Sequence, residues 1–208
     1  MRVKICGLGQ REQAQGIVAL GVQTLGFICV EASPRYVSPA EIQWILEGLP
    51  PTVQAIGVFA NVPLETLARV LDQANLSGIQ LHGQESPEFC HQVKQCFPQK
   101  EVIKALRVAS PATLQQAELY YPWVDTLLLD AYHPQQLGGT GQTLPWEMLQ
   151  TFAPPIPWLL AGGLTPDNVR QALEILRPDG IDLASGVEKA PKDKDLEKVR
   201  QLMRQLAV

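Results

Sequence analysis

Short apolar runs alternate with amphipathic runs along the whole chain, and this alternation constrains the fold more than any other feature. Strictly alternating strands and helices predict a parallel sheet covered by helices. The predicted strands are residues 2–6, 24–30, 53–59, 78–81, 101–107, 126–130, 157–161 and 180–183. Eight such units predict a single α/β domain over residues 1–208, a (β/α)8 TIM barrel, because an open doubly wound sheet usually has fewer strands.

Several predicted helices begin with a Ser or Thr followed by proline, which is typical of a helix start. This pattern occurs at Ser38, Ser86, Ser110 and Thr165. Glu41 follows Ser38 at the spacing of a capping box. The apolar stripe in the tail predicts a last helix over residues 195–206.

Composition excludes several classes of function. The chain has 208 residues and a net charge of −4, without the basic surplus expected of a nucleic-acid-binding protein. No apolar run reaches the roughly 20 residues that cross a bilayer, and the N-terminus lacks a signal-peptide layout. The cysteines, Cys6, Cys29, Cys90 and Cys96, form no CxxC pair, so we expect free thiols and a cytoplasmic location. The last three are expected to be buried in the core.

Two reactive side chains stand at the carboxyl ends of predicted strands. Cys6 ends the first strand, and Asp130 ends the sixth after three leucines. In a parallel barrel these strand ends meet at one face, where active sites lie. A thiol and a carboxyl group that face one substrate form an acid–base pair. Cys6 alone is compatible with a small buried residue, but the barrel context favours catalysis.

Glycines after the last two predicted strands indicate a phosphate site. Gly162 and Gly163 follow the seventh strand, and Ser185 and Gly186 follow the eighth. Glycine lets backbone N–H groups approach an anion, and these two loops are the usual phosphate position in such barrels. Tight turns are the alternative explanation for these glycines.

Further candidate substrate contacts lie in the other strand ends and loops. They are Arg35 after the second strand, Gln80 and His82 at the fourth, Gly139 and Gly141 in the loop of residues 131–144, and Asp182 in the eighth strand. A long loop in a compact domain is usually functional. Residues 138–141 lack the Lys and Ser/Thr of a nucleotide P-loop. A structural histidine is an equally good interpretation of His82.

Short motifs also occur in a distinctive order along nearly the whole chain. They are KICG at 4–7, SPRY at 33–36, GVF at 57–59, QLHG at 80–83, LD at 129–130, GGTG at 138–141, GGL at 162–164 and SGVE at 185–188. Together they resemble the phosphoribosylanthranilate isomerase family of tryptophan biosynthesis. The resemblance implies a (β/α)8 barrel that converts N-(5-phosphoribosyl)anthranilate to 1-(2-carboxyphenylamino)-1-deoxyribulose 5-phosphate. This Amadori rearrangement uses no cofactor and no metal.

The same resemblance implies roles for individual residues. Cys6 matches the general base, Asp130 the general acid, and Arg35 the anchor of the anthranilate carboxylate. The two glycine-containing loops match the phosphate site. Gln142 stands where the family commonly has Lys, so a charged contact from that loop is not expected.

Two alternatives remain open at this level. Another phosphosugar barrel, such as an epimerase or the histidine-pathway isomerase, would have Asp in place of Cys6 or need more well-placed histidines than the three present. A silent phosphate-binding barrel with a regulatory role would lack the acid or the base. We expect a small phosphoribosyl substrate, no nucleic acid or membrane partner, and a monomer or homodimer.

Overall fold

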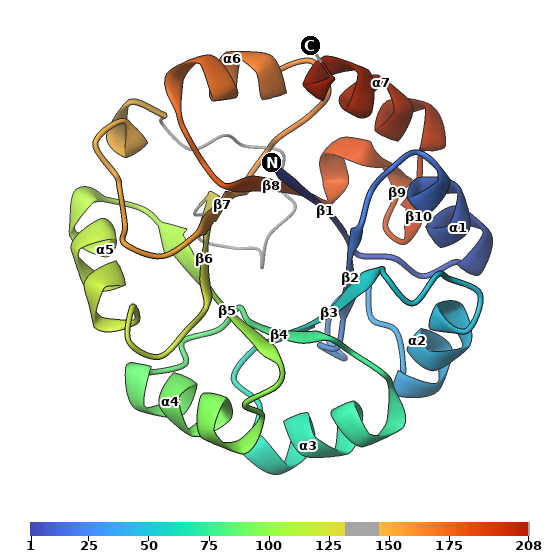
Figure 1. Ribbon diagram of the computed structural model, residues 1–208, viewed down its shortest axis with the longest axis horizontal. Helices are drawn as coiled ribbons and strands as arrows, with labels where there is room; N and C mark the ends of the chain where they lie inside the picture. The colour runs from blue at the N-terminus through green and yellow to red at the C-terminus, as the bar shows by residue number, and fades with distance from the viewer. Residues whose placement is uncertain (132–145, 208) are drawn as a thin grey trace.

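Eight parallel strands close into a barrel in the computed structural model, which describes residues 1–131 and 146–207 (Figure 1). The strands are β1 Arg2–Cys6, β2 Thr24–Ile28, β3 Gln54–Phe59, β4 Gly78–Leu81, β5 Glu101–Val108, β6 Thr126–Ala131, β7 Trp158–Leu160 and β8 Gly180–Leu183. Each strand pairs with the next, and β8 pairs with β1 to complete the ring. The predicted TIM barrel is therefore confirmed.

Helices surround the barrel on its outside (Figure 1). The α-helices are α1 Arg11–Ala19, α2 Pro39–Leu46, α3 Leu64–Gln73, α4 Pro87–Cys96, α5 Pro111–Gln116, α6 Val169–Ile175 and α7 Leu196–Leu206, and the short 3-10 helices are η1 Ala117–Leu119, η2 Trp146–Leu149 and η3 Ser185–Val187. None of the helices in the described ranges is long and apolar enough to cross a membrane.

The predicted helix starts are confirmed at all three Ser-Pro sites, because α2, α4 and α5 each begin at the proline that follows the serine. The start predicted at Thr165 is wrong, because α6 begins at Val169. The Ser38 hydroxyl accepts a hydrogen bond from the Glu41 backbone, and the Glu41 carboxylate accepts one from Ser38 N at 2.7 Å. The Ser86 hydroxyl caps α4 by accepting a hydrogen bond from Phe89 N, whereas Ser110 precedes α5 without a side-chain cap. The Asn168 side chain instead accepts a hydrogen bond from Thr165 N at 2.8 Å, which holds a turn and delays the start of α6.

Two hydrophobic layers hold the barrel together. The larger layer fills the space between the strands and the helices. The smaller one lies inside the barrel and consists of Ile56, Ile103, Ala105, Leu128, Leu159 and Ala161. Because side chains alternate along a strand, β3, β5, β6 and β7 contribute apolar residues to both layers, which explains why these strand sequences are apolar almost throughout.

Two features of the fold differ from the predictions. A two-stranded antiparallel hairpin, β9 Glu188–Ala190 and β10 Asp193–Lys194, follows β8 and was not predicted. Cys96 is exposed at the end of α4, whereas Cys90 is buried and Cys29 is half-buried. Cys96 lies off the helix face that carries Cys90 and Val93, so the core prediction is wrong for this residue.

Candidate active site

A cavity of about 530 Å³ opens at the carboxyl ends of the strands. The predicted site residues in the described ranges all line it: Cys6, Arg35, Gln80, His82, Asp130, Asp182, Gly162, Gly163, Ser185 and Gly186. Their convergence follows from the parallel barrel, which brings all strand ends to one face. The other two candidates, Gly139 and Gly141, lie outside the described residues.

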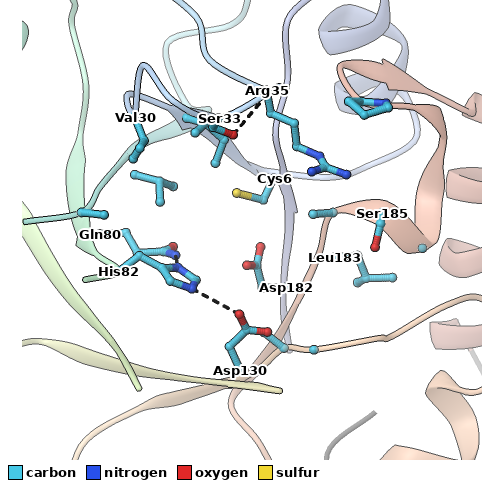
Figure 2. Close-up of a pocket in the computed structure, with 18 of the residues that line it drawn as sticks. Cys6, Val30, Ser33, Arg35, Gln80, His82, Asp130, Asp182, Leu183 and Ser185 are labelled. Carbon is cyan, nitrogen blue, oxygen red and sulfur yellow. Dashed lines mark hydrogen bonds and ion pairs between the residues drawn. The ribbon is translucent and has the colours of Figure 1, made fainter. Parts of the chain in front are cut away.

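Cys6 and Asp130 face the same cavity from strands β1 and β6, and Asp182 lies between them in the view of Figure 2. Cys6 and Asp130 are shielded from solvent, with exposed fractions of 5% and 6%. His82 Nε2 lies 3.2 Å from Asp130 Oδ2, and the Gln80 amide nitrogen lies 2.8 Å from His82 Nδ1. This chain of hydrogen bonds fixes the orientation of the Asp130 carboxyl group.

A buried ion pair lies beside Cys6 in the barrel interior. Lys4 precedes Cys6 by two residues, so both side chains point to the same side of β1. Lys4 Nζ lies 2.9 Å from Asp182 Oδ1 on the adjacent strand β8. Burial works against the charge on Lys4, but the attraction of Asp182 outweighs it and raises the pKa of Lys4. Lys4 therefore keeps its positive charge in the interior.

The surroundings of Cys6 favour the protonated thiol over the thiolate in the free protein. Burial raises the pKa of Cys6 above its ordinary value, and the nearby ammonium groups of Lys4 and Lys194 offset this only in part. A thiol is a much weaker base than a thiolate. Positive charge that a bound ligand brings next to the sulfur would favour the thiolate, which is the form that a base role needs.

Gly26 on β2 makes the space that the Cys6 side chain occupies. The two residues are paired in the barrel. A Cβ atom at position 26 would lie 2.6 Å from Cys6 Sγ and 3.0 Å from Cys6 Cα. Sequence reasoning missed Gly26, because a glycine within an apolar strand signals only a close approach of some unknown neighbour.

The loops after β7 and β8 offer unused backbone donors to the cavity. Gly162 and Gly163 have positive φ angles of 89° and 67°, which side chains rarely tolerate. A Cβ atom on Gly186 would lie 1.8 Å from the Leu164 carbonyl oxygen, so the two loops meet in contact. Within the described ranges, the N–H groups of Gly163, Ser185 and Gly186 donate to no protein acceptor. The arrangement suits an anion such as phosphate.

Arg35 reaches the cavity from the loop after β2 and forms an ion pair with Glu188 (2.7 Å). Glu188 also binds Lys194, with Nζ 2.7 Å from Oε1. Burial opposes the charge on Glu188, but Arg35 and Lys194 outweigh it and hold the pKa of this carboxyl below its usual range. Sequence reasoning missed these contacts, since Glu188 belongs to a quoted motif but its partner lies 153 positions away.

The fold is a (β/α)8 barrel whose cavity is lined by a thiol, a carboxyl group and two loops with backbone N–H donors, an arrangement typical of barrel enzymes with phosphorylated substrates. Comparison of the sequence with known proteins identifies the family within this class of barrels. Residues 3–205 match the family model described as N-(5'phosphoribosyl)anthranilate (PRA) isomerase. The chain belongs to this family.

Curated relatives and solved structures agree with the family match. An N-(5'-phosphoribosyl)anthranilate isomerase from Synechocystis is 64% identical over 99% of this chain and 95% of its own length. One from Crocosphaera subtropica is 60% identical over 99% of this chain and 98% of its own. The Thermus thermophilus enzyme structure is 39% identical, with a TM-score of 0.89, and the match covers 100% of this chain and 98% of that one.

A solved complex adds the chemistry of the ligand. It is a phosphoribosyl anthranilate isomerase in complex with reduced 1-(o-carboxyphenylamino)-1-deoxyribulose 5-phosphate, 32% identical with a TM-score of 0.87 over 99% of this chain and 97% of that one. The predicted activity is thereby confirmed: the chain is an isomerase of tryptophan biosynthesis that acts on N-(5-phosphoribosyl)anthranilate.

Proposed function

We propose that Cys6 and Asp130 carry out the isomerisation as general base and general acid. The observation that carries this assignment is their placement in one cavity, on different strands and largely shielded from water. Protonated Asp130 donates to the ring oxygen of the substrate, and the C1–O bond breaks to give an iminium group. The Cys6 thiolate then removes the C2 proton, and the resulting enolamine tautomerises to the ketone.

Opening of the sugar ring also converts Cys6 into a base. The free protein favours the protonated thiol because burial raises the pKa of Cys6. The iminium nitrogen is positive and lies next to the C2 carbon that Cys6 must reach. Its charge favours the thiolate over the thiol. The thiol proton passes to the Asp130 carboxylate in the same cavity, which has just given its own proton to the ring oxygen. The base is thus generated when the substrate is ready to react.

The ends of the substrate have separate anchors in this proposal. Phosphate binds the N–H groups around Gly162, Gly163, Ser185 and Gly186. The anthranilate carboxylate binds Arg35, because a planar guanidinium matches a carboxylate with two hydrogen bonds. The remaining candidate contacts to the sugar and ring are Gln80, His82, Asp182, Gly139 and Gly141.

Inorganic phosphate should compete with the substrate, and Gly163→Val should remove this competition. Valine at a φ of 67° distorts the loop, and loss of one or two charge-assisted hydrogen bonds should raise KM about 10- to 100-fold. Steady-state inhibition by phosphate measures both effects. Gly21→Val is the matched control, since Gly21 has a φ of 96° but lies outside the cavity lining. Equal phosphate inhibition of Gly163→Val and the parent would place the phosphate site elsewhere.

The alkylation of Cys6 should depend on pH as expected of a buried thiol. Because the pKa of Cys6 is raised, its rate of reaction with iodoacetamide should still be increasing above pH of about 8.5, the ordinary thiol value. Mass spectrometry of the Cys6 peptide at early times gives the rate, with exposed Cys96 as the internal reference. A rate that levels off below that pH would mean that Lys4 and Lys194 outweigh burial.

We also propose a cytoplasmic location and a single domain that acts as a monomer or homodimer. The four free cysteines support a reducing compartment. A phosphoribosylanthranilate isomerase from Thermotoga maritima is described as dimeric, and monomers generated from it have also been solved. Light scattering of the purified chain distinguishes the two states.

A further inference from the structure

We propose that Glu188 positions Arg35 for the substrate carboxylate, and that Lys194 fixes Glu188 to the strand of Cys6. The inference rests on the proposed role of Arg35 and extends it to two residues of the hairpin that follows β8. Glu188 and Lys194 are positioning residues, because they act on the ligand through Arg35.

The contact between Glu188 and Arg35 uses only one edge of the guanidinium group. Arg35 Nε lies 3.1 and 3.0 Å from the two carboxylate oxygens, and Nη2 lies 2.7 Å from Oε2. Arg35 Nη1 donates to no acceptor within the described residues. A guanidinium group has five donors in a rigid plane, so the edge formed by Nη1 and Nη2 stays available to a second carboxylate. Glu188 and the substrate can therefore bind Arg35 together.

Lys194 connects this ion pair to two other parts of the site. Its ammonium group donates to Glu188 Oε1 at 2.7 Å, to the Ala184 carbonyl at 3.2 Å and to the Cys6 carbonyl. Ala184 directly precedes the predicted phosphate loop at Ser185. One buried ammonium group thus contacts the strand of the base, the phosphate loop and the support of the carboxylate anchor.

The hairpin that carries Glu188 and Lys194 is itself held in place. Lys194 N donates to the Gln13 side chain at 2.7 Å, and the Gln13 amide donates to Asp193 at 2.7 Å. Both members of the ion pair are buried, with exposed side-chain fractions of 4% for Glu188 and 0% for Lys194. Buried ion pairs contribute little net stability, so a gain in geometry is the better reason for this one.

The Arg35 side chain packs directly against the backbone of Gly7. A Cβ atom at position 7 would lie 2.9 Å from Arg35 Cδ and 3.5 Å from both Glu188 Oε1 and Lys194 Nζ. Its φ of 82° also favours glycine. The residue after Cys6 therefore leaves space for the three charged groups, and the long arginine side chain has one supported conformation. Ordering before binding lowers the entropy lost when the ligand arrives.

The experiment compares two inhibitors that differ only in the ring carboxylate. One is reduced 1-(o-carboxyphenylamino)-1-deoxyribulose 5-phosphate, and the other is the same compound without the carboxylate. The ratio of their inhibition constants measures the carboxylate contact alone. Arg35→Ala and Glu188→Gln should each reduce the preference for the carboxylate about tenfold or more. The double variant should lose no more than Arg35→Ala, because Glu188 acts through Arg35.

Glu85→Gln is the matched control. Glu85 is a second buried carboxylate in the same barrel, 2.7 Å from Lys104 Nζ, with exposed side-chain fractions of 3% and 2% for the pair. It makes no contact with Arg35, so its replacement should leave the ratio unchanged. Glu188→Asp keeps the charge that Lys194 needs but shortens the reach to Arg35. Inhibition by inorganic phosphate shows whether Glu188→Gln is folded. If it is not folded, the ratio of inhibition constants is measured on Glu188→Asp instead.

The outcomes separate this inference from the function on which it rests. An unchanged ratio in Arg35→Ala would overturn the role of Arg35 and the role of Glu188 with it. A reduced ratio in Arg35→Ala, together with an unchanged or increased ratio in Glu188→Gln and Glu188→Asp, would overturn only the role of Glu188. In that case Glu188 would be a competitor of the substrate carboxylate and not its support.

Discussion

Replacing Cys6 with serine should reduce kcat by a factor of about 100 to 10,000 and leave the fold intact, which is the usual range for the loss of a general base. Serine preserves the size of the side chain in the confined space against Gly26. Its hydroxyl group ionises far above neutral pH, so the iminium charge that favours the Cys6 thiolate cannot generate a comparable alkoxide. The substrate should still bind, because the phosphate and carboxylate anchors are unaffected.

Steady-state kinetics and inhibitor binding test this expectation together. Cys96→Ser is the control, because Cys96 is exposed at the end of α4 and lies outside the cavity lining. This variant should have the kcat of the parent. If Cys6→Ser kept more than about a tenth of the parental kcat, a loss far below the range for a general base, Cys6 would not be the base.

Replacing Asp130 with asparagine should block ring opening. The amide has the shape of the carboxyl group and can keep a hydrogen bond to His82, but it has no acidic proton to give to the ring oxygen. We expect kcat to fall by about 100-fold or more, with KM changed only a few-fold. This pattern marks an interaction made in the transition state and not in the substrate complex.

Asp125→Asn is the matched control for this substitution. Asp125 immediately precedes β6, the strand that carries Asp130, and its carboxylate binds Lys94 and the backbone N–H of Val102. The control should lower stability without lowering kcat. Near-normal turnover by Asp130→Asn would exclude Asp130 as the acid. His82, which lies 3.2 Å from the Asp130 carboxylate, would then be the first residue to test.

The strands were predictable because they follow a local rule. Each strand is a short apolar run because the parallel barrel buries both of its faces. The same apolar pattern therefore occurs in the sequence once for each of the eight strands. The start of α6 was not predictable, because Thr165 precedes proline as a cap residue does and only the Asn168 side chain shows that a turn forms there. The hairpin β9–β10 was missed for a related reason. Its strands are two or three residues long and carry charged side chains.

The residues of the candidate site also fall into two groups: those that local sequence predicts and those that depend on contacts distant in the sequence. Cys6, Asp130 and the glycines after β7 and β8 were found because a barrel places every strand end at one face, so position along the chain predicts position in space. Gly26, Glu188 and Lys194 act by contacting residues far away in the sequence. Lys194, for example, contacts the Cys6 carbonyl across 188 positions. Such contacts depend on the register of the closed barrel, which a single sequence does not reveal.

Substrate fluorescence in a single turnover, with the enzyme in excess, tests the proposed pair most directly because it separates binding from chemistry. The measurement follows N-(5-phosphoribosyl)anthranilate without added cofactor and in the presence of a chelator. With the parent, binding should be followed by loss of the substrate signal as 1-(2-carboxyphenylamino)-1-deoxyribulose 5-phosphate forms. With Cys6→Ser and with Asp130→Asn, binding should persist and the chemical phase should slow by about 100-fold or more. A chemical phase of parental rate in either variant would contradict the account.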